Sequence, residues 1–169
     1  IADELVDPSG LIVVGSGLGG WLAIEAAVRG APFSVLSVLG APGVDITGDP
    51  PVDYFVLMPE ERGALFFDEP GRAPVVEEDT DIRNQMMTAR LVWQPRYVSP
   101  NLLHRLHRVT APTLVVWGQN DRFLSLAHGE ALARGVGNGR LEIVVDSGHF
   151  PATEQPDITA RLIIDFARE

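Results

Sequence analysis

The 169-residue chain contains no cysteine. It therefore has no disulfide, no thiolate nucleophile and no cysteine-ligated metal site. The sequence also lacks any uninterrupted apolar run of about 18 residues, the length that a membrane-spanning helix needs. Its first residues, "IADELVDPSG", carry acidic side chains where a secretory signal would be positively charged. These absences predict a cytoplasmic protein that does not enter a membrane.

Positive charge is scarce as well. The chain has 13 basic and 23 acidic residues, which gives a formal net charge of −10. Between Asp45 and Asp81, eleven acidic residues accompany only Arg62 and Arg72. No basic stripe elsewhere compensates for this segment, so a phosphate backbone would be repelled. The charge pattern excludes nucleic acid as the expected partner.

What the chain does contain is an alternation of predicted strands and helices at its two ends. The segment "LIVVG" is a continuous apolar run, typical of a strand covered on both faces, and Gly30 is the predicted C-cap of the helix that follows. The predicted strands are 11–15, 33–39, 111–118 and 140–145, and the predicted helices are 18–30, 121–135 and 158–169. No hairpin signal interrupts the alternation. We therefore predict an α/β fold with a parallel sheet and helices on both faces.

The middle of the chain, residues 44–110, has a different character. Eight of the thirteen prolines fall between Pro42 and Pro100, and hydrophobic periodicity is patchy. Short helices are predicted at "PEERGALFF" and "TDIRNQMMTARLVW". In the second helix the residues expected on one apolar face are Ile82, Met86, Ala89 and Trp93. Because aromatic side chains give this segment something to bury, we predict a mostly helical cap; a disordered acidic loop is the alternative.

The glycine-rich turn "VVGSGLGG" at residues 13–20 has two interpretations. As G-x-G-x-x-G, its glycines could cradle a dinucleotide at a helix N-terminus. Such a site needs an acidic residue about 20 positions later to bind the ribose. The first acidic residue in that region is Asp45, which lies beyond a Pro-Gly turn. As G-x-S-x-G, the turn could present a catalytic serine on an elbow. Position 17 is then the nucleophile position, and it is glycine. Ser16 lies one residue early, where a side chain on an elbow points elsewhere.

Two side chains follow the ends of neighbouring predicted strands. Asp121 ends "TLVVWGQND" and His149 ends "LEIVVDSGH", so both leave the carboxyl edge of the predicted sheet, where open α/β sheets place their sites. Serine catalysis on an elbow needs an acid and then a histidine in this chain order. Asp146 is a weaker candidate for the acid.

The other histidines carry no comparable signal. His104 and His107 have a spacing that could hold a metal, but neighbouring arginines favour a solvated helix face, and no metal site is predicted. His128 is predicted to be an exposed helix residue. Trp117 is predicted to lie in the core.

Three segments, "VVGSGLGGWLA", "APTLVVWGQNDRF" and "VVDSGHFPATEQPDITARLIIDF", together resemble the α/β-hydrolase family. The resemblance covers most of the chain apart from the cap. It implies a single domain over residues 1–169, with a core of 1–43 and 111–169 and a cap of 44–110. It also implies Asp121 as the triad acid, His149 as the base and the backbone N–H of Leu18 as an oxyanion donor.

The sequence departs from the family pattern in two ways. Gly17 stands at the nucleophile position, and the strands that family members carry before the elbow strand are absent from this chain. The resemblance implies a hydrolase acting on a small apolar ester, lactone or carbon–carbon bond without a cofactor, with His149 and Asp121 but no serine nucleophile. A catalytically inactive binding protein or fragment is the alternative, and a dinucleotide-binding protein is a further one.

Two more expectations follow from these predictions. Trp93 and Tyr97 in the cap, and Trp21 beside the elbow, are candidate contacts for a small-molecule substrate. With the earlier strands absent, strand 11–15 would expose unpaired backbone groups at the sheet edge, which predicts a homodimer through that edge or poor solubility.

Overall fold

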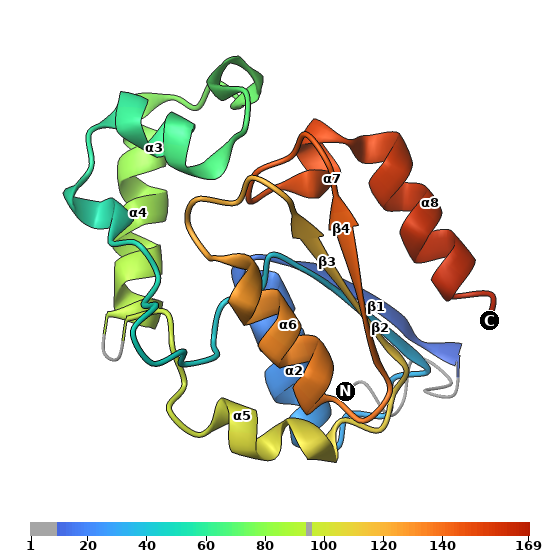
Figure 1. Ribbon diagram of the computed structural model, residues 1–169. Coiled ribbons are helices and arrows are strands. Elements are labelled where there is room, and N and C mark those ends of the chain that lie inside the picture. Colours follow the sequence, from blue (N-terminus) through green and yellow to red (C-terminus); the bar gives the residue numbers. More distant parts are fainter. Residues whose placement is uncertain (1–9, 94–95) are drawn as a thin grey trace.

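The computed structural model describes residues 10–93 and 96–169, and its centre is a parallel sheet of four strands (Figure 1). The strands are β1 (Ile12–Ser16), β2 (Val35–Leu39), β3 (Thr113–Gly118) and β4 (Gly139–Val144). They lie side by side in the order β1-β2-β3-β4, and each neighbouring pair is parallel. The predicted α/β fold is confirmed. Among the described residues, no helix is long and apolar enough to cross a bilayer.

Helices cover both faces of the sheet (Figure 1). On one face α2 packs against β1 and β2, and α6 packs against β3 and β4, whereas α8 contacts β3 and β4 from the other face. The helices of these two layers are α2 (Leu18–Val28), α5 (Leu102–Arg105), η4 (Leu106–Arg108), α6 (Leu126–Gly135), α7 (Pro151–Glu154) and α8 (Pro156–Phe166). Since α5 and η4 pack on α2 and α6, residues 102–108 join the core layer, although the sequence placed them in the cap.

Two apolar clusters fill the space between these layers. The larger one lies under α2 and α6 and includes Ile24, Leu36 and Val115. The smaller one consists of Leu39, Leu114, Val116, Val144 and Phe166. Alternate residues of β2 and β3 therefore enter opposite clusters, which explains why these strands read as continuous apolar runs. Trp117 is fully buried, as predicted, and its indole N–H donates to the carbonyl of Leu124.

Between β2 and β3 lies an insert, residues 44–110. Its residues 44–93 stand beside the carboxyl ends of the strands, whereas α5 lies at their opposite end (Figure 1). Its further helices are η2 (Tyr54–Val56), α3 (Pro59–Phe66), η3 (Pro70–Arg72) and α4 (Glu78–Val92). The rings of Tyr54, Phe66, Tyr97 and Phe123 contact one another and join the insert to the core. The described part of the insert is thus mostly helical and packed.

The orientation of α4 differs from the expectation. Ile82, Met86 and Trp93, expected on a buried face, are 47%, 57% and 53% exposed. Val92 is the residue of α4 that is buried. Periodicity identifies residues that share a helix face, but it does not say which face meets water. The other face of α4 carries polar side chains toward a pocket.

At one edge of the sheet, β1 has no strand partner on its outer side within the described residues. Ile12 and Val14 on this strand are 48% and 50% exposed. Val13, which points to the opposite face, packs on the larger cluster.

Candidate active site

A sharp turn joins the edge strand to the first helix. β1 ends at Ser16 and α2 begins at Leu18, so Gly17 alone makes the connection. Its backbone has φ 53° and ψ −124°, and its N–H donates to the carbonyl of Leu39 at 2.9 Å. Glycine adopts this conformation without the strain that a Cβ adds. The turn projects position 17 from the carboxyl edge of the sheet.

A histidine ring faces the space above this turn. A Cβ placed on Gly17 would lie 3.9 Å from Nε2 of His149 and 4.0 Å from the ring of Phe150. A side chain at position 17 would therefore point at the histidine. Ser16 also lines the pocket here, but no hydrogen bond found among the described residues links its hydroxyl to His149.

Asp121 holds the other side of the histidine ring. Its Oδ2 lies 2.8 Å from Nδ1 of His149, and the two side chains are only 1% and 4% exposed. Oδ1 of Asp121 accepts the backbone N–H groups of Phe123 and Leu124 at 2.9 and 3.0 Å. With Asp121 ionised, Nδ1 carries the proton of a neutral ring, and Nε2 keeps its lone pair. The structure thus brings together the predicted acid and the predicted base.

Aromatic rings exclude water from most of this histidine. The rings of Phe123 and Phe150 lie 4.9 and 4.8 Å from the imidazole, centroid to centroid, and Phe66 lies 5.7 Å away. In such a dry environment hydrogen bonds and charge interactions are stronger than in water.

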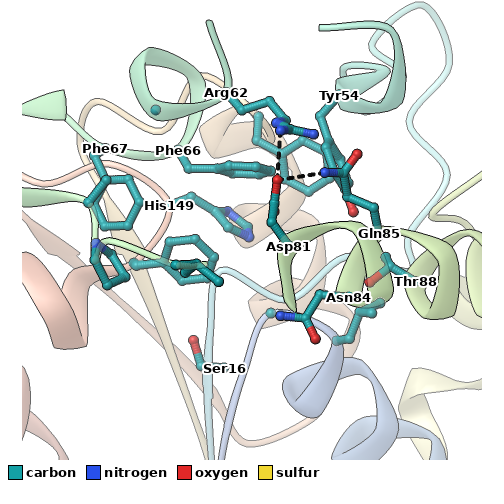
Figure 2. Close-up of a pocket in the computed structure, with 18 of the residues that line it drawn as sticks. Ser16, Tyr54, Arg62, Phe66, Phe67, Asp81, Asn84, Gln85, Thr88 and His149 are labelled. Atoms are coloured by element: carbon teal, nitrogen blue, oxygen red, sulfur yellow. Dashed lines mark hydrogen bonds and ion pairs between the residues drawn. The ribbon is translucent and has the colours of Figure 1, made fainter. Parts of the chain in front are cut away.

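A pocket of about 560 Å³ opens between this ring and the insert (Figure 2). Ser16, Gly17, Leu18 and His149 line its base. One wall is aromatic, with Phe66 and Phe67, and the facing wall comes from α4 (Figure 2). Of the predicted contacts, Tyr97 lines the pocket, whereas Trp21 and Trp93 do not. Trp21 instead lines a smaller hollow outside it, together with Leu22 and Leu91.

Comparison with known proteins identifies the fold family. A family model described as "Alpha/beta hydrolase family" matches residues 1–162. The chain belongs to the α/β-hydrolase family. Among solved structures, a meta-cleavage product hydrolase (CumD) has a TM-score of 0.70 at 19% identity, and a serine hydrolase involved in carbazole degradation (CarC) has 0.74 at 17%.

Curated relatives of this α/β-hydrolase match it over a shorter segment. A 2-hydroxy-6-oxononadienedioate/2-hydroxy-6-oxononatrienedioate hydrolase of Pseudomonas putida is 40% identical over 67 residues, which are 40% of this chain and 24% of the relative. A 2-hydroxy-6-oxo-6-phenylhexa-2,4-dienoate hydrolase of Comamonas testosteroni is 45% identical over 65 residues, 38% of this chain and 23% of the relative. The structural matches to CumD and CarC cover 92% and 97% of this chain, but only 64% and 66% of the CumD and CarC chains.

In this α/β-hydrolase the insert is fastened to both loops of the site. The backbone N–H of His149 donates to the carbonyl of Phe66 at 2.7 Å. Arg122, next to Asp121, donates to the carbonyls of Ala64 and Phe67 at 3.0 and 3.1 Å. The end of α3 therefore holds the acid loop and the histidine loop together.

Glu154 completes this connection, and the sequence analysis did not single it out. Its carboxylate is buried and accepts the backbone N–H groups of Gly148 at 2.6 Å and Asp68 at 2.8 Å. A Cβ on Gly148 would come within 2.6 Å of the Phe66 carbonyl, so the two segments touch through glycine backbone. The sequence signal that could have identified Glu154 is an acidic residue five positions after His149, between Pro151 and Pro156.

The remaining titratable candidates lie elsewhere. The prediction that His128 is exposed is wrong: the ring is fully buried, with Nδ1 3.3 Å from Oγ of Ser125, and burial lowers its pKa. Asp146 is exposed, as are His104 and His107. Within the described ranges no cluster of three potential metal ligands occurs.

Proposed function

We propose that this α/β-hydrolase cleaves an ester, a lactone or a carbon–carbon bond in a small apolar substrate. In place of a serine nucleophile, His149 and Asp121 activate a water molecule. The observation that carries the proposal is the 3.9 Å between Nε2 of His149 and the site of a Cβ on Gly17. A base with its lone pair directed at vacant space can serve a nucleophile that comes from solvent. A cytoplasmic location belongs to the same proposal.

In the proposed mechanism, the reacting carbonyl sits above the turn at Gly17. Water attacks the carbonyl carbon while its proton passes to Nε2 of His149, and Asp121 stabilises the imidazolium through Nδ1. The backbone N–H of Leu18, in the first turn of α2, has no acceptor within the helix and can donate to the oxyanion. When the tetrahedral intermediate collapses, Nε2 returns the proton to the leaving oxygen or carbon.

The names of the relatives support this choice of reaction, not of substrate charge. Two of them are named for cleaving oxo-dienoic acids, and another is named a monoacylglycerol lipase. The first type implies carbon–carbon hydrolysis and the second ester hydrolysis. Because the chain covers only part of the length of these relatives, their activities serve only to choose the substrates that are tested.

Turnover tests the proposal directly. The 169-residue chain is assayed against a panel of small aryl esters, lactones and vinylogous 1,5-diketones. We expect slow hydrolysis that His149→Ala removes and Asp121→Asn lowers by at least about 100-fold, because the base loses its proton partner and its orientation. His104→Ala, an exposed histidine outside the pocket, is the control and should leave the rate unchanged.

A second candidate function is ligand binding without turnover, which the missing side chain at Gly17 favours. In that case pocket ligands bind, but no substrate disappears at a rate that depends on His149. Hydrolysis that is equal in the original chain and in His149→Ala would support binding alone and contradict catalysis.

A further inference from the structure

The wall of the pocket on α4 is polar, although the facing wall is aromatic (Figure 2). Its members Asp81, Asn84, Gln85 and Thr88 are spaced i, i+3, i+4 and i+7, so they occupy one helix face. The apolar side chains of the same helix face water instead. Burying Ile82 and Met86 would have been the more stable arrangement of an ordinary packed helix. The polar face of α4 is partly solvated, and its side chains are available to a ligand in the pocket.

This wall contains no uncompensated charge. Oδ2 of Asp81 accepts hydrogen bonds from Nη2 of Arg62 and Nε2 of Gln85, both at 2.8 Å. Arg62 is the one arginine among the described lining residues, and its side chain is 13% exposed. Because its charge is already paired, it offers little to a ligand carboxylate. The excess of acids between Asp45 and Asp81 further disfavours an anion.

Tyr97 lines the pocket, but its hydroxyl cannot be reached from it. The residue is 2% exposed, and its hydroxyl oxygen is fully buried beside Tyr54. Burial, and secondarily the neighbouring Tyr54, raises the pKa of Tyr97, so the phenol is neutral and able to donate.

The backbone fixes this tyrosine in place. Tyr97 has φ 57°, an uncommon value for a residue with a side chain. Its N–H donates to the carbonyl of Val92 at 3.2 Å, and its carbonyl accepts the N–H of Gly43 at 2.9 Å. Strain of this kind persists when surrounding contacts hold the residue, and it is frequent at ligand sites.

We propose that the pocket recognises a substrate whose end remote from the reacting carbonyl is uncharged and hydrogen-bonding, a carboxamide or a hydroxyl, held by Asn84 and Thr88. The apolar middle of the substrate packs on the ring of Phe66. The assignment of the reacting end rests on the proposed function; the assignment of the polar end does not, because it concerns binding alone.

Three ligands with the same phenylbutyl body test this proposal: butylbenzene, 4-phenylbutanamide and 4-phenylbutanoate. Affinities are measured by ligand-observed NMR at pH 7. We expect the amide to bind about tenfold more tightly than either the hydrocarbon or the carboxylate. Thr88→Val and Asn84→Leu should each weaken amide binding about fivefold, the equivalent of one neutral hydrogen bond, and leave the hydrocarbon unaffected.

Thr80→Val is the matched control, since Thr80 lies on α4 outside the pocket lining and is exposed. It should leave all three affinities unchanged, and thermal melting confirms that each variant is folded. His149→Ala should keep the amide preference even if it abolishes turnover, which separates this inference from the proposed function. Tighter binding of the carboxylate, an amide preference that survives both pocket variants, or no binding of any of the three would overturn the proposal.

Discussion

Gly17 is the residue that decides which chemistry this site can perform. A serine there would place its hydroxyl oxygen one bond beyond a Cβ that lies 3.9 Å from Nε2 of His149. That reach is sufficient for the hydrogen bond between a nucleophile and its base. The backbone of Gly17, with φ 53° and ψ −124°, lies in a sparsely populated region that costs a residue with a side chain about 1–3 kcal/mol.

We predict that Gly17→Ser creates a reactive serine and costs about 1–3 kcal/mol of stability. A fluorophosphonate probe should label the variant and leave the original chain unmodified, as read by intact mass. Gly19→Ser is the matched control, because a Cβ at Gly19 meets no atom within 4 Å, and it should stay unlabelled. Labelling of the original chain at Ser16 would contradict the assignment of position 17.

At the scale of elements, the contact between the end of α3 and the loop before α7 matters most. Glu154 satisfies backbone donors from both segments with a single buried carboxylate. Glutamine at that position would replace one carboxylate oxygen by an NH2 group, which would face a backbone N–H, so two donors would meet.

We therefore predict that Glu154→Gln lowers the free energy of unfolding by about 2 kcal/mol or more, because a buried N–H loses its charged acceptor. Urea denaturation measures the loss. Glu130→Gln serves for comparison: Glu130 forms an exposed ion pair with Arg134, so its loss should stay below about 0.5 kcal/mol. Equal effects of the two substitutions would show that the buried carboxylate does not hold the segments together.

The elements that could be predicted from the sequence are those whose two faces have the same surroundings. β2 and β3 are buried on both faces, so a continuous apolar run suffices to identify them. Asp121 and His149 could be paired because each follows one of two neighbouring strands. The side of α4 that faces water could not be inferred, since its apolar stripe indicated burial. Glu154 and His128 were missed because their burial depends on packing between segments distant in the chain.

At the scale of the whole molecule, β1 lies at an edge of the sheet formed by the described residues. Ile12 and Val14 are half exposed there, and an apolar edge strand invites pairing with another chain. Two copies related by a two-fold axis would pair these strands antiparallel into one sheet of about eight strands.

We predict that the 169-residue chain forms this dimer, and that Val14→Lys shifts it to monomer by placing a charge at the contact. Light scattering over a range of protein concentrations reports the change in mass. Ile164→Lys alters a similarly exposed apolar residue on α8 and should leave the dimer intact. A single monomeric mass for the original chain at every concentration would refute the edge contact.

The outward-facing apolar residues of α4 have a consequence for how the pocket fills. With one buried residue in fifteen, the helix gains little from desolvation, so we predict that it opens locally at a low free-energy cost. The opposite segment, the end of α3, is fixed to the acid and histidine loops. We therefore expect the wall on α4 to open more easily than the wall at the end of α3. A ligand that bonds to α4 contributes its binding free energy to keeping the helix in place, so occupancy of the pocket slows amide hydrogen exchange along α4.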